Sequence, residues 1–252
     1  MPNKRPEIIV TANFPSLIEN AVKRLAARIS KVSSRGAICL TGGSTPKPLY
    51  QRLATEPYRS ELSWNRIHWF WGDDRFVPPE DERSNAGMAR AAFLDRLPIP
   101  PGNIHAIPTN ASNPHEAARH YEAELTRFYG SNLLNPERPL FDLVLMGLGS
   151  DGHTASLFPK HSALIEMNRW VVGVEQAGIA PFVPRVSLTF PALASTREMI
   201  FLVSGQEKRN VVDRVLSGQD LPATRAHATG NLTWLIDREA APEAYPVSSG
   251  GT

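Results

Sequence analysis

One segment limits the possible folds of this chain more than any other. Phe141–Met146 (FDLVLM) is nearly continuous apolar sequence and is followed by a glycine-rich loop. Such a run is typical of a central strand in a parallel sheet, because helices cover both faces of that strand. Parallel strands need long crossover connections, so the rest of the chain should alternate strands with helices.

The remaining segments follow that alternation. Strands are expected at Ile8–Thr11, Ala37–Thr41, Ile67–Trp71, Trp170–Glu175, Val186–Phe190 and Met199–Val203. Helices are expected at Phe14–Val32, Pro48–Ala54, Asn85–Leu94, Pro114–Tyr129 and Gln206–Leu216, with Ser84 and Asn113 as N-caps. Leu232–Ile236 fits either a strand or a helix. The pattern predicts an α/β fold built around a mostly parallel sheet.

The composition is that of an ordinary globular chain. Of the 252 residues, 42% are hydrophobic and 21% are charged, which argues against wholesale disorder. We expect a single domain over residues 1–239 and a flexible tail over residues 240–252, where Ala, Pro, Ser and Gly are frequent. The net charge of +2, without a block of like charge, does not favour nucleic acid as a partner.

The cysteine content and the apolar runs indicate the compartment. Cys39 is the only cysteine, so the chain cannot form an intramolecular disulfide or a multi-cysteine zinc site. No run approaches about 18 apolar residues, and residues 1–11 lack the apolar stretch of a signal peptide. We therefore expect a cytoplasmic protein that has no membrane partner.

Ligands of parallel α/β sheets bind beyond the carboxyl ends of the strands, so the loops there are the candidate sites. The first loop, Thr41–Pro46, contains Gly42, Gly43, Ser44 and Thr45. Its glycines allow backbone N–H groups to approach an anion, and a helix is expected just after it. The loop suits a phosphate, although it is neither a Walker A loop nor a nucleophile elbow, and it also fits an ordinary turn.

The second loop places charged side chains directly after the Ile67–Trp71 strand. Asp73, Asp74 and Arg75 could bind sugar hydroxyls or a charged group, or they could form a surface ion pair. For at least one of the two aspartates the ion pair is the better interpretation. Arg83–Asn85, further along, could face the same crevice.

The third loop, residues 147–159, follows the long apolar strand. Its glycines match G-x-G-x-x-G, but Pro159 leaves no room for the full helix that a dinucleotide fold needs after the third glycine. Asp151 stands two residues before His153. A neutral imidazole can take a proton from water, and a nearby carboxylate can orient the ring. His153 is therefore a candidate general base, with a structural histidine as the alternative.

Two cations follow later strands. Arg185 and Lys208, taken singly, are typical of surface charges, but together with the first loop they could clamp a phosphate. His115 and His120 lie five residues apart, off the spacing that puts two ligands on one helix face. No essential metal is expected.

Taken together, these loops resemble the 6-phosphogluconolactonase family, which shares a superfamily with glucosamine-6-phosphate deaminase. The resemblance runs from about Ile38 to Asp237. It rests on Thr41–Pro46, Asp73–Pro78 with Arg83–Asn85, Phe141–Pro159, Pro184–Thr189 with Pro191–Leu193, Gly205 with Lys208, and Leu221–Ala223. The order and context of these motifs make a chance match improbable.

The resemblance implies a Rossmann-like three-layer fold similar to that of glucosamine-6-phosphate deaminase and ribose-5-phosphate isomerase. It implies hydrolysis of 6-phospho-D-glucono-1,5-lactone in the oxidative pentose phosphate pathway, by a monomer that needs no cofactor. The implied catalytic residues are His153 as general base, Asp151 as its orienting carboxylate, and Arg75 on the phosphate or the ring oxygens. The implied substrate-binding residues are Gly42, Gly43, Ser44, Thr45, Asp73, Arg185 and Lys208.

Two other functions stay open at this point. A glucosamine-6-phosphate deaminase would carry a sequence like DGHIAFNEP, with a glutamate before the proline, whereas this chain has Phe158 there. A non-catalytic sugar-phosphate sensor from a transcription regulator would carry a helix-turn-helix segment, and we find no room for one before Ile8 or after Asp237. The segment Arg225–Ala228 also departs from the family's usual proline-containing turn.

Overall fold

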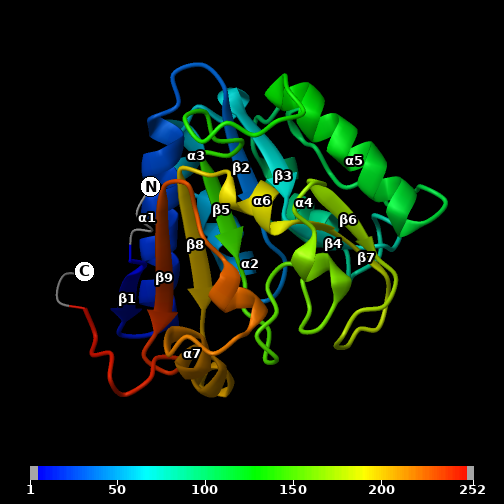
Figure 1. Cartoon of the computed structure of the whole chain (residues 1–252). Helices are drawn as coiled ribbons and strands as arrows, with labels where there is room; N and C mark the ends of the chain where they lie inside the picture. Colours follow the sequence, from blue (N-terminus) through cyan, green and yellow to red (C-terminus); the bar gives the residue numbers. More distant parts are fainter. Residues whose placement is uncertain (1–4, 249–252) are drawn as a thin grey trace.

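The computed structural model describes residues 5–248 and contains a large parallel sheet (Figure 1). Its six strands lie in the order β1-β9-β8-β5-β2-β3, and every neighbouring pair is parallel. They are β1 (Glu7–Thr11), β2 (Gly36–Leu40), β3 (Ile67–Trp71), β5 (Leu143–Met146), β8 (Glu198–Val203) and β9 (Asn231–Asp237). The expected parallel sheet is confirmed, and the ambiguous segment at Leu232–Ile236 is a strand.

A second sheet of three short antiparallel strands has the order β4-β7-β6. Its strands are β4 (Asp73–Arg75), β6 (Val171–Val174) and β7 (Arg185–Leu188). The sequence predicts β6 and β7 with nearly these bounds, but it predicts a loop at β4. Three polar residues carry no apolar alternation, and they form a strand because β7 provides the pairing partner. The separate antiparallel sheet was therefore not predictable from periodicity.

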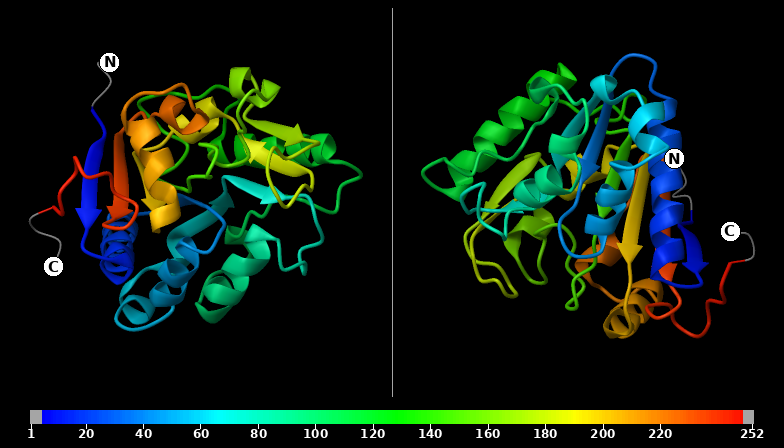
Figure 2. Two further views of the ribbon diagram at one scale, coloured as in Figure 1. Left: turned by 90° about the horizontal axis from the view of Figure 1, so that it is seen from below. Right: turned by 180° about the vertical axis from the view of Figure 1, so that it is seen from behind.

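The described residues also form seven α-helices, most of which lie on the outside of the sheets. They are α1 (Phe14–Ser30), α2 (Pro46–Leu53), α3 (Tyr58–Glu61), α4 (Asn85–Ala92), α5 (Pro114–Tyr129), α6 (Phe190–Ala194) and α7 (Arg209–Leu216). Helices α1, α2 and α4 pack side by side on one face of the large sheet, and the small sheet lies toward the other face (Figure 2). Ser84 and Asn113 cap α4 and α5 through their side-chain oxygens, as the sequence predicts. The helix expected at Gln206–Leu216 begins with a 3-10 turn before α7.

The chain continues past β9 along the edge of the large sheet. Ala240 is fully buried, and the Ser248 N–H donates a hydrogen bond to the carbonyl of Val10 in β1 at 2.9 Å. The tail expected at residues 240–252 is therefore tied to the sheet as far as Ser248, because its backbone finds a partner on an edge strand. The rest of that segment lies outside the described residues.

The strand order reverses direction between β2 and β5, which are both buried along their whole length. The chain runs from β2 outward to β3, and from β5 outward in the opposite direction to β8 and β9. In open α/β sheets, ligands bind beyond the carboxyl ends of the strands at such a reversal. The glycine-rich loops after β2 and β5 meet at this point.

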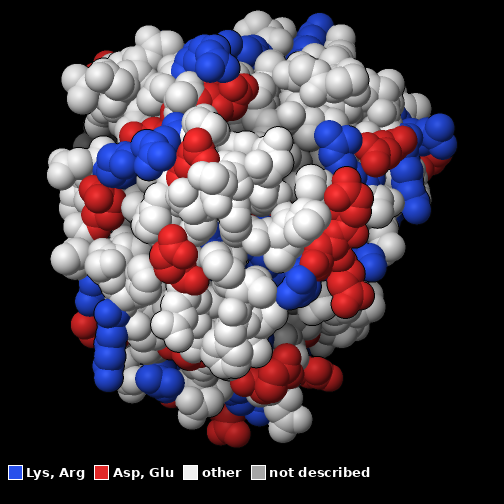
Figure 3. Space-filling view, turned by 90° about the vertical axis from the view of Figure 1, so that its right-hand side faces the viewer, with Lys and Arg blue, Asp and Glu red and all other residues white. Residues whose placement is uncertain are grey.

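The surface carries charges of both signs. On the face shown in Figure 3, Lys and Arg side chains lie among Asp and Glu side chains, and several Asp and Glu side chains form one band in the right half of the view. Within residues 5–248, no helix is both long enough and apolar enough to span a membrane.

Candidate active site

The reversal point of the large sheet holds a pocket of about 280 Å³. The pocket is lined by residues that include Thr41, Gly42, Gly43, Asp73, Arg75, Asn85, Gly149, His153, Ile179, Ala180, Arg185 and Lys208. The large sheet and the small sheet both contribute to it. Ser44 and Thr45 line an adjoining hollow of about 150 Å³, and Asp151 contacts His153. The sequence-predicted site residues therefore lie in or beside one pocket.

His153 is oriented by Asp151. The imidazole Nδ1 lies 2.5 Å from Oδ1 of Asp151, which also accepts a hydrogen bond from the backbone N–H of His153 at 3.0 Å. Burial opposes the charge of the Asp151 carboxylate, but the hydrogen bonds and charge of His153 outweigh burial and hold the pKa of Asp151 below its usual value. When Nδ1 donates to a carboxylate, Nε2 is the ring nitrogen that remains free to accept a proton.

The space around the imidazole is closely fitted. The buried Phe158 ring packs against His153 with a centroid separation of 4.7 Å. A Cβ atom at Gly149 would lie 2.0 Å from Nδ1 of His153, so glycine is needed there for the ring to occupy its position. An apolar ring cannot transfer a proton, so Phe158 shapes the site around His153 without adding a second acid or base.

Two arginines lie opposite each other across the β4–β7 pair. Arg75 and Arg185 are register partners, and both line the pocket. Burial lowers the pKa of Arg185, Asp73 opposes this shift, and Arg75 adds to it. Nε of Arg75 is buried and has no hydrogen-bond partner within the described part of the chain. Like charges placed directly opposite each other destabilise a sheet, so this pair favours an anionic ligand in the pocket beside the two guanidinium groups.

The glycine-rich loop after β2 lies beside a third cation. Gly42, Gly43 and Lys208 line both the main pocket and the adjoining hollow. A Cβ atom at Gly42 would lie 1.8 Å from Oδ1 of Asn85, so glycine allows α4 to close against the loop. A loop that presents its backbone next to a lysine suits a phosphate group.

The two adjacent aspartates face different surroundings, because neighbouring side chains of a strand point to opposite faces. Asp74 accepts hydrogen bonds from the backbone N–H groups of Asn85 at 2.7 Å and Ala86 at 3.0 Å, so it holds the start of α4. Burial raises the pKa of Asp74 to about 6, although these hydrogen bonds oppose the shift. Asp73 instead lines the pocket. The surface ion pair that the sequence favoured for at least one aspartate is wrong for Asp74, which is a buried helix anchor.

Part of the pocket was not predicted. Ile179 and Ala180 lie in a segment without strand periodicity or charge, so no pattern marks them as lining residues. Asn85, which the sequence placed near the same crevice, does line the pocket. No group of three or more His, Cys, Asp or Glu side chains within residues 5–248 could hold a metal ion. The absence of an essential metal stays a prediction.

Known proteins are similar to this chain over nearly its whole length. The sequence model of the glucosamine-6-phosphate isomerase/6-phosphogluconolactonase family matches residues 13–234. The 6-phosphogluconolactonase of Synechocystis sp. is 40% identical over 248 residues, which cover 96% of this chain and 99% of the relative. That of Streptomyces coelicolor is 35% identical and covers 97% of this chain and 98% of the relative.

Solved structures share the fold. The 6-phosphogluconolactonase from Trypanosoma cruzi has a TM-score of 0.83 and 30% identity, and it covers 94% of this chain and 96% of its own. That from Thermotoga maritima has a TM-score of 0.80 and 29% identity, with 93% and 100% covered. A monomeric glucosamine-6-phosphate deaminase shares the fold alone, with a TM-score of 0.79 at 21% identity. The chain therefore belongs to the glucosamine-6-phosphate isomerase/6-phosphogluconolactonase family, among its 6-phosphogluconolactonases.

Proposed function

We propose that this pocket hydrolyses 6-phospho-D-glucono-1,5-lactone to 6-phospho-D-gluconate, with His153 as the general base. The observation that carries this proposal is the 2.5 Å contact between His153 Nδ1 and Asp151 Oδ1, in a pocket that three cationic side chains also line. The lactone has a carbonyl carbon that water can attack and a phosphate that cations can bind. The pocket provides a histidine that can activate the water and cationic side chains that can bind the phosphate.

The reaction needs one proton acceptor that later becomes a donor. Nε2 of His153 takes a proton from water while the water oxygen bonds to C1 of the lactone, and the C1 carbonyl becomes an oxyanion. When the oxyanion collapses, the bond between C1 and the ring oxygen breaks, and His153 returns its proton to that oxygen. Asp151 orients the imidazole and stabilises its charged form. A positioned base contributes roughly 10²–10⁴-fold to the rate.

The remaining polar groups bind the substrate. Lys208, Arg185 and the loop from Gly42 to Thr45 bind the phosphate, and Asp73 accepts hydrogen bonds from sugar hydroxyls. Arg75 acts either on the phosphate or on the oxygens at C1, where backbone N–H groups also stabilise the oxyanion. The pair of opposed arginines supports both positions, since an anion develops at C1 and a permanent one is present at C6.

We further propose that the enzyme uses no cofactor, is a monomer and works in the cytoplasm. These proposals rest on the family resemblance and on the single cysteine, Cys39. Deamination of glucosamine 6-phosphate is not favoured, because Phe158 offers no proton next to His153.

Replacing Lys208 tests the phosphate part of the proposal. Lys208→Ala should raise the KM for the phosphorylated lactone about 10- to 100-fold, since a charge-assisted hydrogen bond is lost, and it should leave hydrolysis of unphosphorylated glucono-1,5-lactone nearly unchanged. Lys31→Ala, which removes an exposed lysine at the end of α1, is the matched control. An unchanged KM with equal hydrolysis of both lactones would remove Lys208 from the phosphate site.

A further inference from the structure

A chain of buried hydrogen bonds leads from Asp73, which lines the pocket, to two serines that have no role in the mechanism above. Oγ of Ser156 donates a hydrogen bond to Oδ2 of Asp73 at 2.6 Å. The backbone N–H of Ser156 donates to Oγ of Ser187 at 3.2 Å, and that hydroxyl donates to the carbonyl of Leu188 at 2.9 Å. Ser156 and Ser187 are fully buried, and Asp73 is 7% exposed. Buried polar groups specify one geometry only when each has its partner, and this chain satisfies both hydroxyls.

These hydrogen bonds join three parts of the site. Ser156 stands three residues after His153 in the loop after β5, Asp73 begins β4, and Ser187 lies in β7. Asp73 and Ser187 are register partners, next to the opposed pair Arg75 and Arg185. A shift of Ser156 would therefore move the loop that carries His153 relative to the strands that carry both arginines.

The loop around Ser156 is held in an unfavourable backbone conformation. Ala155 has a φ of +47°, in the left-handed region where a Cβ atom is strained. Such a residue persists only when its neighbours fix it. Here Thr154 Oγ1 donates to the carbonyl of Gly147 at 2.9 Å on one side, and Ser156 bonds Asp73 on the other.

The Asp73 carboxylate also depends on Ser156 for its direction. Within residues 5–248, Ser156 provides the hydrogen bond to this carboxylate, and the bond occupies Oδ2. A carboxylate accepts up to about four hydrogen bonds, so Asp73 keeps unused acceptor capacity at the pocket that it lines. Hydroxyl groups of a bound sugar are donors of the kind that this capacity needs.

We propose that Ser156 is a positioning residue for lactone hydrolysis. Ser156 fixes Asp73 as the acceptor for a substrate hydroxyl, and it holds the His153 loop against β4 and β7. This proposal rests on the proposed function. Ser156 does not touch the substrate. It acts through Asp73, and this coupling distinguishes it from a serine that merely stabilises the fold.

A double-mutant cycle tests the coupling. Ser156→Ala and Asp73→Asn should each lower kcat/KM for the phosphorylated lactone by about tenfold or more, because a misplaced group costs much of the rate. If Ser156 acts through Asp73, the double variant should be no slower than Asp73→Asn alone. Ser195→Ala is the matched control, since Ser195 is also buried and accepts a hydrogen bond from the Leu140 N–H far from the pocket. It should keep the wild-type kcat/KM.

Three results would overturn the role of Ser156: wild-type kcat/KM in folded Ser156→Ala, losses that multiply in the double variant, or an equal loss in Ser195→Ala. Circular dichroism establishes folding. If Ser156→Ala does not fold, Ser156→Cys takes its place in the cycle, because a thiol keeps the shape but donates weakly. Wild-type protein without lactone turnover would overturn the proposed function together with this inference, so the two failures are distinguishable.

Discussion

The His153 imidazole occupies a space that its neighbours define atom by atom. Asp151 holds one nitrogen, Phe158 covers the ring, and Gly149 leaves the gap into which Nδ1 fits. A general base contributes most to the rate when its ring is held in the geometry that proton transfer needs. Adding a single methyl group at this site should therefore lower the rate of catalysis.

Gly149→Ala should lower kcat about 10- to 100-fold while the protein stays folded, because the new Cβ would lie 2.0 Å from Nδ1 and must displace the imidazole. Steady-state kinetics and circular dichroism measure the two effects. Gly102→Ala is the matched control, since a Cβ atom at Gly102 meets nothing within 4 Å. Equal kcat values for both variants would contradict this view of the imidazole pocket.

Single residues also show where sequence patterns stop being informative. The spacing of Asp151 and His153 predicted their pairing, because a short glycine-rich turn brings the two side chains together. The residues alone could not decide between Asp73 and Asp74, since the choice depends on β4 being a strand whose alternate side chains face opposite sides. Only the family resemblance implied Asp73 as the substrate-binding aspartate. Ser156 carried no signal of its own, because its partner Asp73 is distant in the chain.

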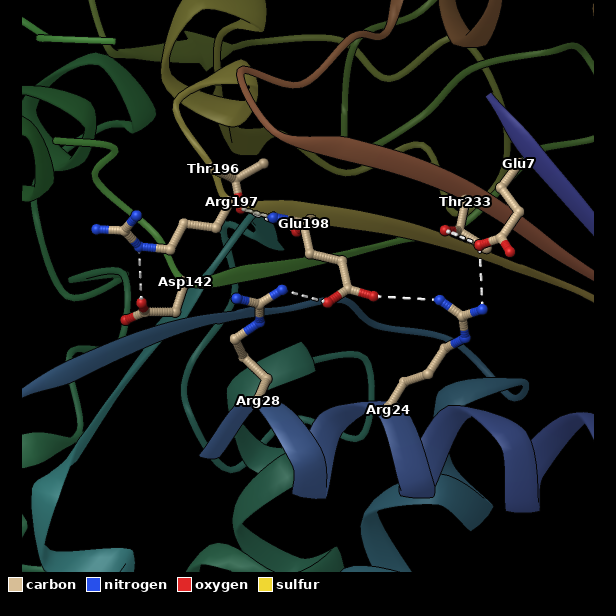
Figure 4. Close-up of polar contacts among 8 residues, drawn as sticks. All are labelled: Glu7, Arg24, Arg28, Asp142, Thr196, Arg197, Glu198 and Thr233. Atoms are coloured by element: carbon tan, nitrogen blue, oxygen red, sulfur yellow. Dashed lines mark hydrogen bonds and ion pairs between the residues drawn. The ribbon is translucent and has the colours of Figure 1, made fainter. Parts of the chain in front are cut away.

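At the scale of elements, α1 is fastened to the sheet by charge as well as by apolar packing (Figure 4). Glu198, at the start of β8, pairs with Arg28 at 2.7 Å and with Arg24 at 3.4 Å, and Arg24 also reaches Glu7 of β1 at 3.0 Å. The Glu198 side chain is only 10% exposed. Removing one member of such a partly buried ion pair lowers the stability of the fold, because the remaining charges lose their partner.

Glu198→Ala should lower the free energy of unfolding by about 1–3 kcal/mol, because two arginines on α1 are left without their shared carboxylate. Urea unfolding measures the change, and lactone hydrolysis should be unaffected. Glu19→Ala, which removes a more exposed partner of Arg52, should cost only about 0–1 kcal/mol. Similar losses in the two variants would mean that burial does not strengthen the Glu198 cluster.

Most elements were predictable because their burial leaves a period in the sequence. The helix α5 (Pro114–Tyr129) has the predicted bounds, since Asn113 and the following proline mark its start. The strand β3 (Ile67–Trp71) is buried at nearly every position and was equally clear. The strand β4 was not predictable, because a three-residue polar strand is defined by its partner β7 alone.

At the scale of the whole molecule, the pocket exists because two sheets meet at the reversal of the strand order. The sequence predicted most strands, but not β4, and it placed the candidate site at the carboxyl ends of the parallel strands, where the pocket lies. It could not predict that β4 and β7 pair in a separate small sheet and place Arg75 and Arg185 in the pocket, since no periodicity reports which strands are neighbours. The family resemblance supplied the three-layer fold that the alternation alone left open.

The pH dependence of global stability should depend on a histidine pair far from the pocket. Nδ1 of His68 lies 2.8 Å from Nε2 of His105, whose Nδ1 lies 2.8 Å from Glu124. Burial, then His105, then Arg35 lower the pKa of His68 to about 4. The unfolded chain, with a histidine pKa near 6.5, therefore binds this proton first, and stability is lost as the pH falls from about 6.5 to about 4.

The stability penalty of His68→Gln should thus be on the order of 1 kcal/mol smaller at pH 5 than at pH 7.5, after allowance for the exposed part of the half-buried ring. Urea unfolding at the two pH values measures it. His120→Gln changes an exposed histidine on α5 and should show no such difference. A His68→Gln penalty that does not change with pH would show that His68 is not held neutral by its surroundings.

The most direct test of the central claim is the rate at which 6-phosphogluconolactone disappears. The lactone is made fresh from glucose 6-phosphate and its dehydrogenase, and it is followed at mildly acidic pH, where uncatalysed hydrolysis is slow. Wild-type protein and a His120→Ala control should consume it rapidly, and folded His153→Ala should be slower by about 10²–10⁴-fold. Near-wild-type turnover by His153→Ala would contradict the assignment of the general base, and background loss with the folded wild-type protein would contradict lactone hydrolysis itself.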